Sequence, residues 1–239
     1  MELSTLDFLQ GLFSLIFVII SLFIGLIILS KYFVYHHRLY ILVGLSWIGI
    51  SSPWFGDAVN YLLIITTGEQ ISPFLSFLIS FSLLPVFVLC WLVAFNDLTT
   101  PNNKWLIIVP YLIIGIIFEV IFFYYLFTDV SLLGTYIGLF HLVFTPFMQL
   151  YLFVNTIVFL ITGLIFSGKS MKSEDDKVRI KGRFLGLAFI VFIIGAVLES
   201  LIPLTATTVV IARIVMILSA LLFYLGFILP EWVAKIFVK

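Results

Sequence analysis

Seven long apolar runs constrain the fold of this chain more than any other feature of its sequence. Each has the roughly twenty residues that a helix needs to cross a bilayer core of about 30 Å. Backbone groups in lipid must be satisfied within a helix or a closed barrel, and these runs lack the alternation of barrel strands. The sequence therefore predicts an all-α membrane protein with a single seven-transmembrane-helix bundle. The expected spans are 8–30, 39–65, 71–95, 105–127, 136–166, 182–204 and 209–229.

Composition supports the same class. Of 239 residues, 63% are hydrophobic and only 10% are charged, which leaves too little polar surface for a soluble domain. The lipid bilayer is therefore an expected partner, and we expect a multi-pass protein of the cell membrane. The first run is longer than a signal-peptide core and follows the acidic leader MELSTLD, so we expect it to be retained as a helix.

The basic residues orient the bundle. If the N-terminus is outside, every lysine and arginine except Arg213 falls in the loops or the tail on one face, or beside them. The loops on the other face carry Glu69 and Asp129 and no basic residue. Because lysine and arginine resist translocation, we expect the N-terminus outside and the C-terminus in the cytoplasm.

An unusually polar stretch, SSPWFGDAVNYLL (51–63), interrupts the second run. Pro53 predicts a kink in this span just below Asp57. The ionisable residues inside spans all fall in the outer half of the predicted bundle, on several helices. Since an intramembrane charge is costly, these groups should face the bundle interior or a water-filled cavity. We therefore expect an outward-facing polar pocket, open to a small-molecule ligand from outside. Its candidate ligand-binding residues are Trp54, Asp57, Asn60, Glu119, His141 and Gln149.

The charged members of this set have structural interpretations as well. Glu199 and Arg213 lie at similar depth on consecutive runs, so we predict a structural ion pair, with ligand contact as the alternative. Asp57 and Glu119 have no second intramembrane cation available. Either they are protonated and hydrogen-bonded, or they leave an acidic pocket that favours a cation or an amine.

The longest hydrophilic stretch, SGKSMKSEDDKVRIKGR (167–183), precedes the sixth run. Ser173 and Asp176 fit a capping box, which predicts that the helix begins near Glu174, below the membrane. One interpretation is a solvated helix end that attracts anionic headgroups. The other is a docking surface for a cytoplasmic effector protein. The candidate docking residues are Lys177, Arg179, Lys181 and Arg183.

Two further patterns concern packing. The motifs GTYIG (134–138) and GRFLG (182–186) let helices approach closely, either within the bundle or between copies. The tail PEWVAKIFVK (230–239) begins with a proline that ends the seventh span. It predicts a short amphipathic helix in the inner headgroup layer, with a continuation of the seventh helix as the alternative. The apolar face of that helix would carry Trp232, Val233, Ile236 and Phe237.

Several chemistries are disfavoured. His36 and His37 are predicted on one side of the membrane and His141 on the other, so we expect no metal site. The run 209–229 has no lysine to hold retinal, and phosphate-binding glycine loops, nucleophile elbows and cysteine pairs are absent from the sequence. We therefore expect no catalytic residues, no cofactor, no enzyme activity and no nucleic-acid partner.

The runs DDKVRIKGRFLGLAFIVFIIGAVLES and IARIVMILSALLFYLGFILPEW resemble uncharacterised seven-helix membrane proteins of archaea, particularly the Asgard group. Those proteins are in turn loosely similar to the seven-helix sensor module of some histidine kinases. The resemblance covers about 175–232, with a weaker similarity in LVGLSWIGISSPW (42–54). It implies a sensor-like bundle and transfers no assigned activity. Since we expect no output domain before the chain ends at Lys239, signalling would require a separate protein.

Three functions from different classes fit these observations. The first is a stand-alone receptor or sensor with an outward polar pocket and a cytoplasmic partner. The second is a small transporter or proton-coupled permease using Asp57, Glu119 and Glu199. The third is a structural or lipid-interacting membrane protein. The sequence has no internal repeat and little charge in the inner halves of its spans, which counts against a transport path and favours the receptor.

Overall fold

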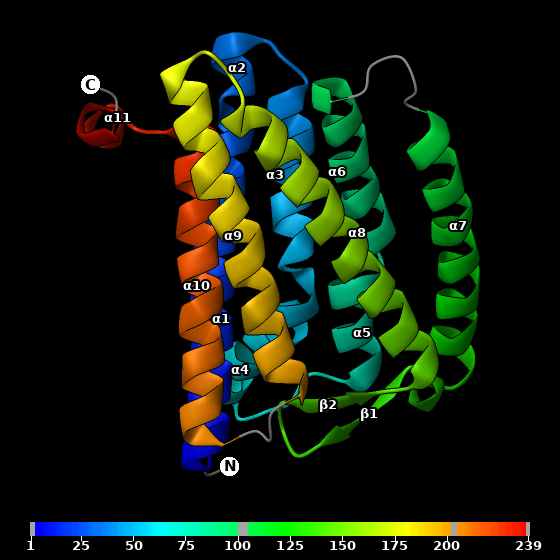
Figure 1. Ribbon diagram of the computed structural model, residues 1–239. Helices are drawn as coiled ribbons and strands as arrows, with labels where there is room; N and C mark the ends of the chain where they lie inside the picture. The colour runs from blue at the N-terminus through cyan, green and yellow to red at the C-terminus, as the bar shows by residue number, and fades with distance from the viewer. Residues whose placement is uncertain (1–2, 100–104, 202–204, 238–239) are drawn as a thin grey trace.

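The computed structural model describes residues 3–99, 105–201 and 205–237. Within these residues, seven helical spans are long and apolar enough to cross a membrane, which confirms the predicted seven-helix bundle. Several spans are built from two helices, and the elements follow one another up and down the bundle (Figure 1). The helices and strands are α1 (Thr5–Ser30), α2 (Tyr32–Tyr35), α3 (Leu39–Ile50), η1 (Ser52–Trp54), α4 (Phe55–Thr67), α5 (Pro73–Phe81), α6 (Leu84–Thr99), α7 (Trp105–Thr128), η3 (Val130–Leu132), β1 (Gly134–Ile137), β2 (His141–Phe144), α8 (Pro146–Met171), α9 (Asp176–Leu201), α10 (Ala206–Ile228) and α11 (Glu231–Phe237).

The two ends of the bundle differ in structure (Figure 1). One end carries the N-terminus and the β1–β2 strand pair, and we call it the hairpin end. The opposite end carries α2, α11 and the turn between α8 and α9, and we call it the basic end. Parts of four predictions lie outside the described residues: the first two residues of the leader, Lys104, the end of the run 182–204, and the last two tail residues, which include Lys239.

The core is largely aromatic and draws buried residues from helices throughout the bundle, and α1 packs on α3, α4 and α10. Trp47 of α3 is 2% exposed and stacks on Phe223 of α10 with ring centroids 3.9 Å apart. Gly25 of α1 faces Gly44 of α3, where a Cβ on Gly44 would lie 2.7 Å from the Gly25 carbonyl oxygen. Two glycines at this crossing therefore allow α1 and α3 to approach backbone to backbone.

The second span is broken where the sequence predicts a kink. Helix α3 ends at Ile50, and a 3-10 helix with Pro53 in its first turn leads into α4. The neighbouring helix α5 compensates for the interrupted backbone ladder. The Ser52 hydroxyl donates to the Ser80 carbonyl oxygen at 2.6 Å, and the Gly56 amide donates to the Ser80 hydroxyl at 2.9 Å. The break is thus held in one geometry by its contacts with α5.

The predicted helix over 136–166 is wrong in its first third. Residues Gly134–Ile137 and His141–Phe144 form an antiparallel strand pair, and the helix begins only at Pro146. Gly138 has a φ of 81° in the connecting turn, a conformation that glycine adopts without strain. Thr145 is extended, as the residue before a proline prefers, and Pro146 suits the first helical turn. The GTYIG motif therefore lies in the hairpin rather than on a helix surface.

The second glycine motif does lie at a helix contact. In α9, a Cβ on Gly182 would lie 2.8 Å from the Met171 amide nitrogen, and one on Gly186 would lie 2.5 Å from the Ser167 hydroxyl. The Ser167 hydroxyl also donates to the Gly182 carbonyl oxygen at 2.7 Å. GRFLG therefore joins α9 to α8 within one bundle.

The tail forms a helix of its own. Leu229 has a φ of 45°, which ends α10, and α11 then lies beside the bundle at the basic end, out of line with α10 (Figure 1). Val233 and Ala234 are buried in a cluster with Ile180 and Leu229. The sequence had placed Val233 on the same face as Trp232, but Trp232 is 66% exposed while Val233 is 2% exposed. The helix therefore divides its apolar residues between the bundle and its outer surface.

The orientation of the bundle is tested by cysteine labelling on intact cells. In a background with Cys90→Ala, single cysteines are introduced at Thr67, Ser131 and Glu174, which are exposed positions at the two ends. We expect an impermeant thiol reagent to label positions 67 and 131 and not 174, because positively charged loops stay cytoplasmic. Labelling at position 174 alone would show that the bundle has the opposite orientation.

Candidate functional site

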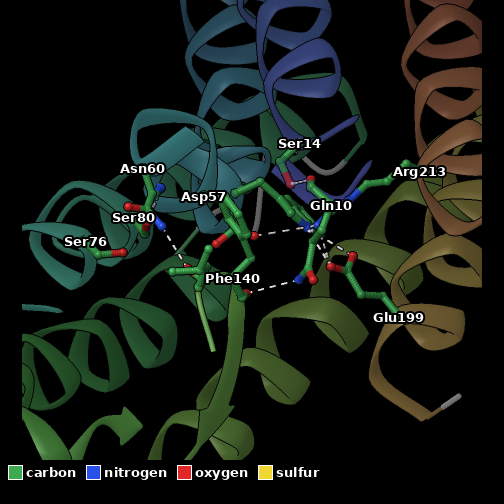
Figure 2. A network of polar contacts seen from close by, with 12 residues as sticks. Gln10, Ser14, Asp57, Asn60, Ser76, Ser80, Phe140, Glu199 and Arg213 are labelled. Carbon is green, nitrogen blue, oxygen red and sulfur yellow. Dashed lines mark hydrogen bonds and ion pairs between the residues drawn. The ribbon is translucent and has the colours of Figure 1, made fainter. Parts of the chain in front are cut away.

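A buried arginine shared by two carboxylates forms the centre of the candidate site (Figure 2). The Arg213 side chain on α10 is 1% exposed. One of its terminal nitrogens donates to Glu199 Oε1 on α9 at 2.7 Å and lies 3.7 Å from Asp57 Oδ2 on α4. The ion pair predicted between Glu199 and Arg213 is therefore present, and Asp57 extends it to a group of three charges on three helices.

Trp54, at the break in the second span, completes this group. Its indole nitrogen donates to Glu199 Oε2 at 3.0 Å, so Glu199 bonds both Arg213 and Trp54. The Arg213 guanidinium carbon also lies 5.5 Å from the centroid of the Trp54 ring, within the range of a cation–π contact. The geometry of the broken span therefore positions both an acid and an aromatic ring against the arginine.

Helix α1 supplies two polar residues that the sequence analysis did not select. The Ser14 hydroxyl donates to the Gln10 carbonyl oxygen at 2.7 Å and also interacts with the Asp57 carboxylate. The buried Gln10 side chain donates to the Phe140 carbonyl oxygen at 3.1 Å. The sequence contains one indication of their role. Gln10 and Ser14 are four residues apart, which puts both on one face of an otherwise apolar helix.

The turn of the β1–β2 hairpin is fastened over this network by two side chains. Phe140, 2% exposed, accepts the bond from Gln10 of α1. The side-chain amide of Asn60 on α4 donates to the Leu139 carbonyl oxygen at 2.8 Å, and its oxygen accepts from the Ile71 amide at 3.0 Å. Asn60 therefore ties the hairpin to the loop before α5, instead of pointing at Arg213 as a ligand contact would.

Strand β1 adds a further contact to α5. The Tyr136 hydroxyl and the Ser76 hydroxyl are 2.5 Å apart. Burial raises the pKa of Tyr136 to about 12, so the phenol is neutral at physiological pH. The hairpin is thus joined to helices α1, α4 and α5 by specific hydrogen bonds, which makes it part of the site and not a loose loop.

Three predicted pocket residues lie elsewhere. Gln149 is exposed on α8, and its side chain donates to the Phe144 carbonyl oxygen at 3.1 Å. His141 lies in β2 opposite Ile137. The helix starts at Pro146, ten residues later than expected, so His141 lies in the hairpin and Gln149 in the first turn of α8. Glu119 is at the expected depth on α7, but it faces a groove beside α6.

The predicted docking residues at the basic end divide into two pairs. The Lys181 ammonium donates to the Phe227 carbonyl oxygen at 3.0 Å, close to the C-terminus of α10, and Arg179 forms an ion pair with Asp176. These two side chains therefore have structural roles, one of them at a helix C-terminus where a cation is favoured. Lys177 and Arg183 are exposed.

Two features of the three-charge group allow it to bind a further cation. It contains two acids and one base, and the acids are the more accessible members, with 15% of the Asp57 side chain and 22% of the Glu199 side chain exposed. Within the described residues, the second terminal nitrogen of Arg213 has no hydrogen-bond partner. Arg213 is therefore held closely by Glu199 and loosely by Asp57, which leaves Asp57 able to pair with another cation.

No protein-family model, curated protein or solved structure matches the chain in the three comparisons made with known proteins. The functional proposal below therefore rests on the geometry of the site.

The charge group predicts a specific pattern of stabilities. Arg213→Ala should lower the free energy of unfolding by about 3–5 kcal/mol, because it leaves buried carboxylates without their cation. The double variant Glu199→Gln with Arg213→Gln should recover part of that loss, because it replaces the closer pair by neutral amides and leaves only Asp57 without its cation. Unfolding in mixed micelles measures both, with Gln149→Ala as the control outside the network. A loss in the double variant as large as the sum of the losses in Glu199→Gln alone and Arg213→Gln alone would contradict the pairing.

Proposed function

We propose that the chain is a seven-helix receptor or sensor that binds a small cationic ligand at the hairpin end and signals through a cytoplasmic partner protein. The observation that carries the proposal is the sharing of one buried guanidinium by two partly exposed carboxylates at the break in the second span. In this proposal the hairpin end faces outside, as the distribution of basic residues predicts.

The charge balance supports a cationic ligand. Asp57 and Glu199 together exceed the charge of Arg213 by one negative unit when both are ionised. Arg213 is 2.7 Å from Glu199 and 3.7 Å from Asp57, so Asp57 is the acid with capacity for a second partner. An amine or small cation arriving from the hairpin end would complete the pairing with Asp57, and the indole of Trp54 would offer it an aromatic face.

The position of the charges supports a signalling role. Asp57 lies three residues after the 3-10 segment that breaks the second span, and Glu199 and Arg213 lie on two helices that continue to the basic end. A ligand that changes the pairing of Asp57 alters the forces across this break. A receptor requires such an element with two arrangements that a ligand can bias. The break, with α4 on one side of it and α3 on the other, has this role in the proposal.

The basic end supplies the output surface in this proposal. Lys177 and Arg183 project from the first turns of α9, the helix that carries Glu199 at its other end. Because both are exposed basic side chains, the partner we propose for this surface is an acidic cytoplasmic protein. Helix α9 would thus connect the ligand end to the partner end.

Ligand-dependent stability tests the proposal. The protein in nanodiscs is heated in propylammonium chloride and in sodium chloride of equal ionic strength. We expect stabilisation by the amine, since a ligand at a hundred times its Kd adds about 2.7 kcal/mol. Asp57→Asn should abolish the effect, and Gln149→Ala should preserve it.

The same experiment separates the competing functions. Equal behaviour of the two salts, or equal stabilisation of Asp57→Asn, would contradict an amine-binding receptor and favour a structural role for the charge group. Accumulation of the amine in proteoliposomes, absent with Asp57→Asn, would replace the receptor with a permease.

A further inference from the structure

A groove between α6 and α7 lies apart from the charge group. It has a volume of about 190 Å³ and is bounded by Pro85 of α6 and by Tyr111, Gly115 and Glu119 of α7. Helix α7 stands at the edge of the bundle, on the side away from α10, and packs mainly on α6 (Figure 1). A Cβ on Gly115 would lie 3.3 Å from the Cβ of Pro85, so the missing side chain leaves this space open.

Glu119 is the unusual member of this groove. Within the residues the structure describes, neither of its carboxylate oxygens has a hydrogen-bond partner, and both are buried. The Tyr111 hydroxyl is already engaged, because it donates to Asn155 Oδ1 at 2.5 Å and lies 3.3 Å from the Tyr151 hydroxyl. A buried carboxyl group without a partner is costly, so this position calls for a group from outside the chain.

The groove is reached from lipid. Glu119 lies nine residues before the end of α7 at Thr128, which is about 13 Å along a helix. Residues around it on α7 are exposed and apolar, with Ile116 56% exposed and Val120 66% exposed. At this depth and on this surface, the surrounding solvent is the hydrocarbon of the membrane. A ligand for Glu119 must therefore dissolve in the bilayer.

A second copy of the chain does not supply the missing group. The described lysines and arginines lie toward the basic end, apart from Arg213, and Arg213 is buried among its own partners. No cation from another bundle therefore reaches Glu119 at this depth through the described residues. A small molecule dissolved in the bilayer can supply this cation.

We propose that the α6–α7 groove is a binding site for a lipid-soluble amine, whose nitrogen pairs with Glu119 and whose apolar chain lies along α7. An amine provides donors for both carboxylate oxygens and compensates their charge, whereas an alcohol offers one donor and no charge. Typical drug-sized pockets exceed 300 Å³, so a groove of about 190 Å³ holds only the amine-bearing end of such a molecule. The rest of the ligand remains in the bilayer.

Protection from a lipid-soluble carbodiimide tests the site in the unmodified protein. The reagent activates a carboxyl group, which then rearranges to a stable adduct or is captured by a primary amine as an amide with release of a urea. Peptide mass mapping counts both products as labelling. In nanodiscs we expect dodecylamine to slow labelling at Glu119 at least fivefold, and dodecanol at the same membrane concentration to leave it unchanged. No protection by dodecylamine, or equal protection by dodecanol, would overturn the proposal.

Direct binding of radiolabelled dodecylamine separates this site from the charge group at the hairpin end. Glu119→Gln keeps the shape of the side chain and should weaken binding at least tenfold. Gln149→Ala should bind dodecylamine as the wild type does, because Gln149 lies outside both the groove and the charge group. Unchanged binding by Glu119→Gln would overturn the assignment to Glu119, whereas the propylammonium stabilisation and its loss in Asp57→Asn test the receptor proposal separately.

Discussion

The burial of Arg213 is the constraint on which the structure of the hairpin end depends. A guanidinium that is 1% exposed in a membrane bundle needs anions nearby, since an unpaired buried charge costs several kcal/mol. Glu199 of α9 and Asp57 of α4 meet this need from two sides, and Trp54 covers the group with its ring and bonds Glu199. Because Trp54 and Asp57 flank the end of the 3-10 segment, the break at Pro53 is what delivers them to Arg213.

The two ends of the bundle use their polar groups differently. At the hairpin end, the network extends from Asp57 through Ser14 and Gln10 to the Phe140 carbonyl oxygen, so the hairpin and the charges form one connected unit (Figure 2). At the basic end, cations neutralise helix ends: the Lys169 ammonium donates to the Thr99 carbonyl oxygen, as Lys181 does to that of Phe227. The hairpin end is thus held by a polar network that joins a surface element to a broken helix, whereas the basic end is held by capped helix ends.

The sequence predicts the spans well, because lipid allows few alternatives to an apolar helix. It also predicts the kink at Pro53 and the pairing of Glu199 with Arg213, since depth along consecutive helices brings two opposite charges together. It does not predict the hairpin, because an apolar run such as 136–166 fits a helix or a strand pair and the outcome depends on Gly138 and Pro146. Depth alone also grouped Glu119 with Asp57, although helix rotation directs the two into different parts of the bundle. The bond to Phe140 involves a backbone carbonyl and has no side-chain signature.

In the proposed receptor, occupancy at Asp57 changes the arrangement of the helices at the basic end. Spin labels at Glu174, before α9, and Lys235, on α11, in a Cys90→Ala background report this arrangement as a distance in nanodiscs with and without propylammonium chloride. The amine should shift the distance distribution when Asp57 is present and leave it unchanged in Asp57→Asn. An unchanged distribution in the protein that retains Asp57, under conditions where the amine is bound, would rule out this coupling.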